Sequence, residues 1–553
     1  MIEQASLVIG EGNWAVKSDS LLGYKINGGK YYPREMSVVR ATTGTRINED
    51  GLVELVPYNL YSKSNDFSTW GNIVNVTVTP NYTTSPEGTQ NASRFQALAY
   101  GFIFNLGTTA TVGEPITISV YAKRNDSGTQ SVGFFQGDSA IEYAFSLTNE
   151  WQRFEYTTNF LNDYIGIAAN SGADISIYGF QIVQGSSALD YLPTTDRLDV
   201  ARIDYSSGSG ALLVEPQRSN RLLYSEQFDI SSYWGVNAGV TISSSVAISP
   251  SGILNADRYI ESTPNNNAYQ LAINSSGTFS ASIYVKKASS SNIGFGAVGP
   301  GFSGGMSVKF NLDNQTFDTP INYGNFTSIT SSYEALDNGW YRITLSGTTL
   351  TSDSYYFVIG SLQDTTYTAN TYIWGAQFEV GSYQTSYIPT QAATVTRNAD
   401  VISKTGIADL IGQTEGVVFL DYLYTELDIN GNIPITIGLN GTNAAYIYFR
   451  NNGVIRCDFI VGAAAQGRID TPSSYSVKGT RYKIAFAYKA NDFTVYINGQ
   501  LIGTDNSGAI TGLSDLFLNY PYNSGFNATS NINAVALYKT RLTNAELATL
   551  TTI

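Results

Sequence analysis

The chain has 553 residues, of which only 14% are charged, and it contains 39 Tyr and 26 Phe. The formal net charge of −14 and the lack of a basic stripe exclude nucleic acid and anionic membranes as expected partners. The sequence has no histidine, which excludes Ser-His-Asp and Cys-His catalysis and most zinc or iron ligand sets. The single Cys457 excludes an intrachain disulfide.

Residues 1–50 form a lead segment, which we expect to anchor the protein to its partners. This segment lacks the basic start of a signal peptide, so we expect synthesis in the cytoplasm. An Arg-containing joint recurs at residues 46–48, 202–204 and 397–399. This joint is interpreted either as a strand that docks one module on the next through an Arg–carboxylate contact, or as an ordinary polar linker.

A module of about 150 residues occurs twice in the chain. Six landmarks recur in the same order, which chance does not explain. A duplicated module is typical of proteins built for display and binding rather than for chemistry. The matched positions are Trp70 and Trp234, Pro86 and Pro250, Tyr121 and Tyr284, Trp151 and Trp340, Gln181 and Gln377, and Pro193 and Pro389.

The offset between the two copies locates an insertion in the second one. It rises from 163 residues at Tyr121 and Tyr284 to 189 residues at Trp151 and Trp340. We expect the extra residues to form a surface loop within residues 289–337, because loops accept added length at low cost. If the copies bind different ligands, this region is where recognition is expected to differ.

Strand patterns dominate both copies. Residues 116–121, 279–285 and 341–345 alternate apolar and polar side chains with period two. Short strands separated by Gly, Asn and Ser predict an all-β fold in which each copy is an antiparallel β-sandwich of the jelly-roll type. No helix is expected between residues 50 and 400.

The last part of the chain has a different pattern. Residues 401–411 fit a turn or two of helix, and the strands that follow include residues 416–422, 445–449 and 482–489. Asn498-Gly499 predicts a tight hairpin, because both residues tolerate positive φ. Thr543 followed by Glu546 predicts a capped C-terminal helix.

Residues 493–499 and 536–547, in this order and about 45 residues apart, resemble the laminin-G-like, concanavalin-A-like sandwich. The resemblance covers residues 401–553. It implies two stacked antiparallel sheets and a carbohydrate or protein ligand, with calcium in some members. No calcium ligands can be assigned in this chain, and no other cofactor is expected.

The two copies resemble the carbohydrate-binding-like jelly-roll modules of bacteriophage fibre and tail proteins. The resemblance depends on residues 40–46, 213–220, 375–379 and 386–390, and it covers most of residues 35–400. Copy one departs from the pattern at residues 56–59 and has Phe180 where copy two has Ala376. The domains expected are an anchor at 1–50, sandwich copies at 51–200 and 201–400, and the laminin-G-like domain at 401–553.

Three aromatic residues are candidates for stacking on a sugar ring: Trp374, Tyr446 and Tyr448. Tyr446 and Tyr448 are two residues apart and so share one face of a strand. Trp374 replaces Tyr178 of copy one, which also fits a packing role. The repeated Trp70 and Trp234 are interpreted as core residues, because equivalent positions in two copies usually reflect packing.

One carboxylate pattern resembles a catalytic motif. Glu426, Asp428 and Asn430 follow the spacing of the Glu-x-Asp-x-Glu strand of laminarinase-like hydrolases, whose outer carboxylates act as nucleophile and general acid. Asn430 cannot donate a proton as an acid, and Asn430-Gly431 fits a turn better than a strand. The chain is therefore predicted not to be an enzyme.

Together these features predict a structural protein on the virion surface of a tailed bacteriophage, made in the host cytoplasm. Residues 1–50 would contact other virion proteins, and the displayed modules would bind host-surface polysaccharide. We expect a homo-oligomer, a trimer by analogy with fibres, without membrane insertion or nucleic acid. Two alternatives stay open: a polysaccharide depolymerase, and a decoration or adaptor protein without a ligand.

Overall fold

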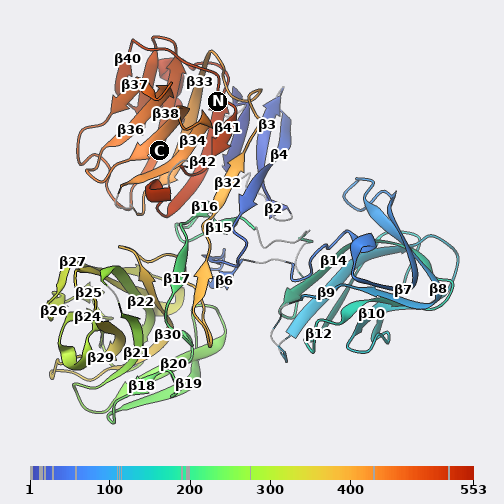
Figure 1. Cartoon of the computed structure of the whole chain (residues 1–553), viewed down its shortest axis with the longest axis horizontal. Coiled ribbons are helices and arrows are strands. Elements are labelled where there is room, and N and C mark those ends of the chain that lie inside the picture. Colours follow the sequence, from blue (N-terminus) through green and yellow to red (C-terminus); the bar gives the residue numbers. More distant parts are fainter. Residues whose placement is uncertain are drawn as a thin grey trace. The chain divides into compact units, whose positions relative to one another are not determined.

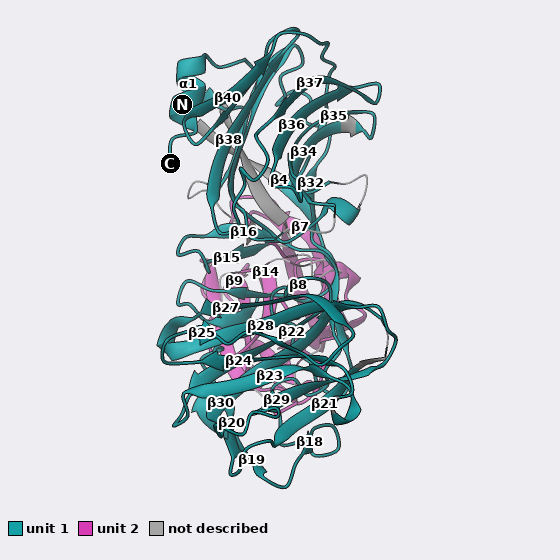
Figure 2. Ribbon diagram, turned by 90° about the vertical axis from the view of Figure 1, so that its left-hand side faces the viewer, with its two compact units in different colours: residues 1–14, 22–56, 202–553 teal, residues 15–21, 57–201 magenta. Residues whose placement is uncertain are grey.

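A computed structural model describes residues 4–10, 16–17, 20–27, 30–56, 59–108, 110, 112–113, 115–188, 191–192, 194, 200–274, 276–426, 430–520 and 524–553. Among these residues nearly all regular structure is β-strand, and α1 (Asn544–Leu550) is the one α-helix, which confirms the all-β prediction (Figure 1). The chain divides into two compact units. Unit 1 comprises residues 1–14, 22–56 and 202–553, and unit 2 comprises residues 15–21 and 57–201 (Figure 2).

Unit 2 contains the first copy of the module, folded as an antiparallel β-sandwich. Strand β8 belongs to both layers, because Ser93–Gln96 pair with β14 while Gly101–Phe104 pair with β13. The pairing order is β11-β10-β13-β8-β14-β9-β12, with β7 beside β8. The strands are β7 (Asn72–Thr83), β8 (Ala92–Phe104), β9 (Pro115–Arg124), β10 (Val132–Gln136), β11 (Tyr143–Ala144), β12 (Gln152–Asn159), β13 (Ile165–Ala169) and β14 (Asp174–Gln184).

The second copy lies in unit 1 and has two separate sheets, so the predicted sandwich is confirmed in both copies. One sheet has the order β18-β21-β29-β23-β24-β25, with β26 beside β24, and the other has the order β19-β20-β30-β22-β28-β27. Its strands are β18 (Gly235–Val236), β19 (Val240–Ile248), β20 (Leu254–Glu261), β21 (Asn267–Asn274), β22 (Gly277–Lys287), β23 (Asn292–Val298), β24 (Gly305–Asn311), β25 (Thr316–Phe317), β26 (Ile321–Asn322), β27 (Phe326–Ala335), β28 (Trp340–Thr349), β29 (Ser354–Gly360) and β30 (Asn370–Val380).

The inserted region of copy two is not the loop that its spacing suggested. Residues 289–337 form β23 to β27, and β27 adds an edge strand beside β28 over most of its length. Residues 326–335 contain Phe, Ile, Tyr and two Thr, residue types that favour an extended chain on a pleated surface. The expectation of a loop was wrong because the insertion extends a sheet edge rather than bulging from it.

The C-terminal part of unit 1 is a second kind of sandwich. One sheet centres on β42, which pairs with β33, β1 and β16, and it continues through β38, β39 and β40. The other runs β4-β32-β41-β34-β35-β36-β37. The strands are β15 (Arg202–Asp204), β16 (Ala211–Val214), β32 (Val401–Lys404), β33 (Glu415–Leu423), β34 (Asn432–Asn440), β35 (Asn443–Phe449), β36 (Ile455–Val461), β37 (Ala464–Asp470), β38 (Arg481–Lys489), β39 (Phe493–Ile497), β40 (Gln500–Asp505), β41 (Asp515–Phe517) and β42 (Ser530–Tyr538).

Local signals in this domain are mostly confirmed. Asn498 and Gly499 both have positive φ, 49° and 79°, in the turn between β39 and β40. Thr543 and Glu546 form the capping box that begins α1. The helical turn expected at 401–411 was wrong for Val401–Lys404, which is strand β32 and pairs with β4 and β41, while a single turn closed by the Leu410 amide and the Ile407 carbonyl lies at residues 407–410.

Residues 1–50 do not form a separate segment. β1 (Leu7–Gly10) pairs with β42 along Leu537–Ala534, and β4 (Lys30–Val39) pairs with β32. β3 (Ser20–Asn27) pairs with β1 and β4, and its start pairs with β2 (Val16–Lys17). The proposed boundary at residue 50 is therefore corrected: the N-terminal strands complete both sheets of the C-terminal sandwich. Two short strand pairs complete unit 1. They are β5 (Thr45–Ile47) with β6 (Val53–Leu55), and β17 (Arg218–Asn220) with β31 (Val395–Arg397).

A buried ionic cluster lies where the joints of unit 1 meet. Arg202 donates to Glu215 at 2.7 Å and to Asp400, Arg397 donates to Glu215 at 2.6 Å, and Arg40 donates to Asp400 at 2.9 Å. All five side chains are at most 1% exposed. Of the two interpretations of the joint, the Arg–carboxylate contact is confirmed at Arg202 and Arg397, whereas Arg46 of the first joint pairs with Glu54 of its own β5–β6 hairpin.

Candidate functional site

The outer face of the sheet around β35 carries two of the predicted sugar-contact residues. Ile447 and Phe449 point into the core and are fully buried, so Tyr446 and Tyr448 point to the opposite face, where both are half-buried. The tyrosine pair therefore lies on one strand face, as predicted. Whether the pair contacts a ligand stays a prediction.

The first row of this face runs across three strands from Tyr446 through Asp458 to Arg468. The Tyr446 hydroxyl donates to Asp458 Oδ2 at 3.1 Å, and Arg468 donates to the same oxygen from Nε at 3.0 Å and Nη2 at 2.6 Å. Burial and the negative charge of Asp458 raise the pKa of Tyr446. The tyrosine hydroxyl is thereby fixed, while the Arg468 side chain remains 44% exposed at the edge of the row.

The second row runs beside the first, from Tyr448 through Arg456 to Asp470. Arg456 donates through Nε and Nη2 to the two Asp470 oxygens, each at 2.7 Å. These hydrogen bonds lower the pKa of Asp470. The Asp470 side chain is 37% exposed, so this ion pair borders solvent next to the Tyr448 ring.

Two further aromatic residues pack against the tyrosine pair. Tyr520 meets Tyr446 at 5.8 Å between ring centroids, and Phe526 meets Tyr448 at 5.6 Å, both edge-on. Tyr520 and Phe526 also contact one another at 5.6 Å. Sequence reasoning missed them because they lie some seventy residues further along the chain, outside any alternating pattern.

The candidate tryptophan is placed elsewhere. Trp374 is 2% exposed and packs against Tyr284 and Tyr387 with ring centroids 5.2 and 4.8 Å apart. A ring enclosed by two others offers no face to a sugar, which removes Trp374 from the candidates for stacking. Trp70 and Trp234 are 3% and 1% exposed, so their interpretation as core residues is confirmed.

Two of the three positions of the carboxylate motif, Glu426 and Asn430, lie among the described residues. Glu426 lies after the end of β33 and pairs with Lys478 at 2.5 Å, and burial raises its pKa. Asn430 is a turn residue before β34, as predicted, and Asp428 lies outside the described residues. Within the described part of the chain there is no group of three or more His, Cys, Asp or Glu that could hold a metal ion. Ligands for the calcium that the resemblance implies can therefore not be assigned among these residues.

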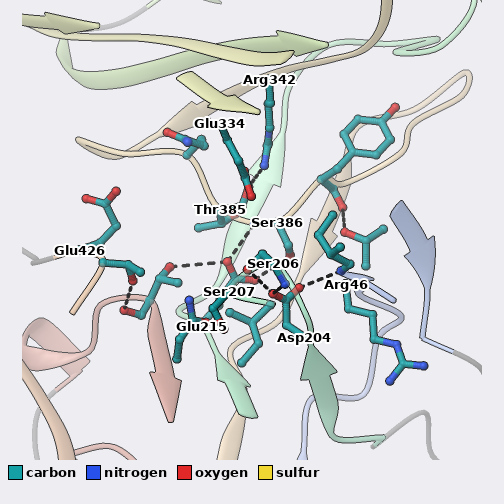
Figure 3. A pocket seen from close by; sticks show the side chains of 18 of the residues that line it. Arg46, Asp204, Ser206, Ser207, Glu215, Glu334, Arg342, Thr385, Ser386 and Glu426 are labelled. Atoms are coloured by element: carbon teal, nitrogen blue, oxygen red, sulfur yellow. Dashed lines mark hydrogen bonds between the residues drawn. The ribbon is translucent and has the colours of Figure 1, made fainter. Parts of the chain in front are cut away.

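A cavity of about 350 Å³ lies elsewhere in unit 1, between the second copy and the C-terminal sandwich (Figure 3). Glu426 and Lys478 line it together with residues of the repeated module and of the joints. Figure 3 shows Glu334 and Arg342 entering it from strands β27 and β28, opposite Asp204 and Glu215.

None of the helices among the described residues has the length and apolar composition of a membrane-spanning segment.

No family model matches the chain, and no curated protein sequence matches it. Among solved structures it is similar to the CBM40 domain of a Ruminococcus gnavus IT-sialidase bound to α2,3 sialyllactose, with 19% identity over 26% of this chain and 86% of that chain and a TM-score of 0.23. The tandem CBM22 domain of Paenibacillus barcinonensis Xyn10C is 12% identical over 62% of this chain and 99% of that one, with a TM-score of 0.21. Domains LG4-5 of the mouse laminin α1 chain are 10% identical over 49% and 84%, with a TM-score of 0.19. These similarities define no family for this chain.

Proposed function

We propose that the chain is a glycan-binding protein and that the outer face of β35, β36 and β37 is its binding surface. Sugar rings stack on aromatic side chains, and their hydroxyl groups bond to planar charged groups beside the ring. The observation that carries the proposal is the arrangement of two adjacent rows, each with a tyrosine next to an Arg–carboxylate pair. A saccharide lying across the rows would stack on Tyr446 and Tyr448 and bond to the exposed edges of Arg468 and Asp470.

A glycan array probed with the intact chain tests this proposal. The double substitution Tyr446→Ala and Tyr448→Ala removes two stacking contacts of about 0.5–1.5 kcal/mol each, so affinity should fall about tenfold or more. Tyr143 of β11 and Tyr156 of β12 in unit 2 are a matched control, because they too are neighbouring tyrosines that are not fully buried, with ring centroids 5.3 Å apart. Equal binding by both double variants would contradict the assignment of the surface.

We also propose that the protein binds its glycan without cleaving it. Glu426 is engaged by Lys478, and a turn residue, Asn430, stands where the hydrolase motif needs an acid. Incubation with host capsular polysaccharide should release no reducing sugar. Release that is abolished by Glu426→Gln would instead establish a depolymerase.

We propose, finally, that the site of action is the virion surface of a tailed bacteriophage. The resemblance of residues 40–46, 213–220, 375–379 and 386–390 to phage fibre and tail modules supports this location. Because β1 and β4 are paired within the sandwich, residues 1–50 would have to contact other virion proteins without leaving their sheets. Cryo-EM of purified particles tests the location and the expected trimer. If purified particles lack the chain, the proposed location is wrong. Glycan binding is then decided by the array alone.

A further inference from the structure

The insertion in copy two changes a row of side chains that both copies share. In copy one the row runs Tyr178, Tyr121, Arg153, and it ends at β12, the last strand of its sheet. In copy two the matching row continues from Arg342 to Glu334, because β27 pairs with β28 at this position. The insertion thus places one additional carboxylate beside the repeated arginine.

Glu334 faces the cavity and makes no hydrogen bond with any described side chain. Burial raises its pKa; Arg342 opposes this shift, and the nearby Asp204 adds to it. Arg342 donates to the Thr385 carbonyl at 2.7 Å and to Ser282 Oγ at 3.2 Å, and no described carboxylate forms an ion pair with it. The carboxylate of Glu334 is therefore available to a ligand.

The other charged groups of the cavity are already engaged. Lys478 pairs with Glu426 at 2.5 Å, and Arg46 pairs with Glu54 at 2.8 Å. Asp204 accepts from the Ile47 amide at 2.7 Å and has no ion-pair partner among the described residues. Glu334 and Asp204 thus lack an ion-pair partner among the described residues and share the cavity with one unpaired cation, Arg342, which leaves a surplus of one negative charge among these three groups.

Two buried polar atoms in the cavity wall are also unpartnered within the described structure. Asn531 Oδ1 accepts no hydrogen bond and Arg342 Nε donates none, although the two residues are only 7% and 4% exposed. Buried polar atoms are normally hydrogen-bonded, and leaving one unpaired costs about 1–3 kcal/mol. Both atoms have almost no exposed surface, so a ligand that offers a donor and an acceptor would satisfy them only after the Asn531 and Arg342 side chains turn toward the cavity.

We propose that this cavity is a second binding site, separate from the tyrosine face, for a hydroxylated primary amine of monosaccharide size, such as an amino sugar with a free ammonium group. The ammonium would pair with Glu334 and, once the Asn531 and Arg342 side chains turn toward the ligand, its hydroxyl groups would donate to Asn531 Oδ1 and accept from Arg342 Nε. The volume of about 350 Å³ falls in the range of small-molecule sites. A ligand of this charge would also relieve the repulsion between Glu334 and Asp204.

Calorimetric titration of the intact chain with glucosamine, glucose and N-acetylglucosamine tests the proposal. Glucosamine should bind about tenfold more tightly than the two uncharged sugars, the gain expected of one charge-assisted hydrogen bond. Glu334→Gln should abolish that preference, whereas Glu150→Gln, at an exposed position of unit 2, should preserve it. Tyr446→Ala with Tyr448→Ala should leave glucosamine binding unchanged, which separates this site from the proposed glycan surface.

Three results would overturn the proposal: no saturable binding of glucosamine, equal binding of all three sugars, or a preference that survives in Glu334→Gln. Thermal unfolding of each variant shows whether it is folded. If Glu334→Gln does not fold, Asn531→Leu provides the test, because loss of its acceptor should weaken glucosamine binding several-fold. Unchanged binding in a folded Asn531→Leu would then count against the site.

Discussion

The two copies of the module share several internal contacts and differ most at one sheet edge. Ser64 Oγ lies 2.7 Å from the Tyr191 hydroxyl, and Ser225 Oγ lies 2.7 Å from the Tyr387 hydroxyl. In both copies this serine also accepts from a threonine amide, at 2.8 and 2.9 Å. These repeated contacts are therefore structural, and the copies diverge where a strand was added.

The backbone at a repeated glycine also shows that the copies share structural positions. Gly179 and Gly375 have positive φ, 66° and 62°, and each lies at the irregular register of the strand that carries it. A Cβ at Gly179 would lie 3.1 Å from the Tyr191 ring, and one at Gly375 would lie 2.9 Å from Tyr284. The duplicated glycine is thus required by a bulge and by the ring beside it.

The largest effect expected to be common to both copies is loss of the core tryptophan. Trp70→Ala and Trp234→Ala should each destabilise the module that carries it by about 3–5 kcal/mol, because a large buried ring is replaced by a cavity. Chemical denaturation measures both. Trp151→Ala is the control, since this half-buried side chain should cost less. A strongly unequal cost for Trp70 and Trp234 would contradict equivalent packing.

Loss of the ionic cluster should destabilise unit 1, which contains copy two, and leave unit 2, which contains copy one, unchanged. All five residues of the cluster belong to unit 1. Asp400→Asn leaves Arg40 and Arg202 short of a buried negative charge, which should cost about 3 kcal/mol. Differential scanning calorimetry should show a lower unfolding temperature for unit 1 alone. Asp353→Asn is a matched exposed control in the same unit. Equal loss in both units would show that the cluster does more than join the segments of unit 1.

The same cluster gives a pH prediction. Burial alone would raise the pKa values of Glu215 and Asp400, but the adjacent guanidinium groups outweigh it and hold both below their usual range. Stabilisation from lowered carboxyl pKa values is complete above the unfolded-state values, about 4, and is lost as pH falls toward the folded-state values. Acid titration monitored by circular dichroism should show a steeper loss below about pH 4 for the natural chain than for Asp400→Asn. Parallel curves would contradict the role of these carboxylates.

Sequence patterns predicted what is local and missed what depends on distant partners. The hairpin at Asn498, the cap at Thr543 and the buried Trp70 and Trp234 follow from turn chemistry, capping and repetition. The pairing of β1 with β42 joins residues about five hundred positions apart, and no local propensity specifies such a partner. The role of the insertion was missed for the same reason, because its strands form only against the sheet of the second copy.

A smaller effect should be equal in the two copies. Ser64→Ala and Ser225→Ala each remove a hydroxyl that bonds to a tyrosine hydroxyl and to a threonine amide, which should cost about 1–3 kcal/mol. Urea denaturation of the two single variants measures the difference directly. Because the geometry is nearly identical, we expect the two costs to agree within about 0.5 kcal/mol. Disagreement beyond this would show that the surroundings of the copies, rather than the shared contact, decide its energy.

The smallest effect concerns a position where the copies use different chemistry for the same contact. Arg94 donates to both oxygens of Asp174 in copy one, whereas Arg258 donates to Asn370 at 2.9 Å in copy two. The Arg94 hydrogen bond lowers the pKa of Asp174, but both side chains are partly exposed. Asp174→Asn, which gives copy one the amide of copy two, should therefore cost less than about 1 kcal/mol. High salt should reduce the difference from the natural chain, because exposed ion pairs are screened. A cost above about 2 kcal/mol that does not depend on salt would show that Asp174 also serves the packing of β14 against β8.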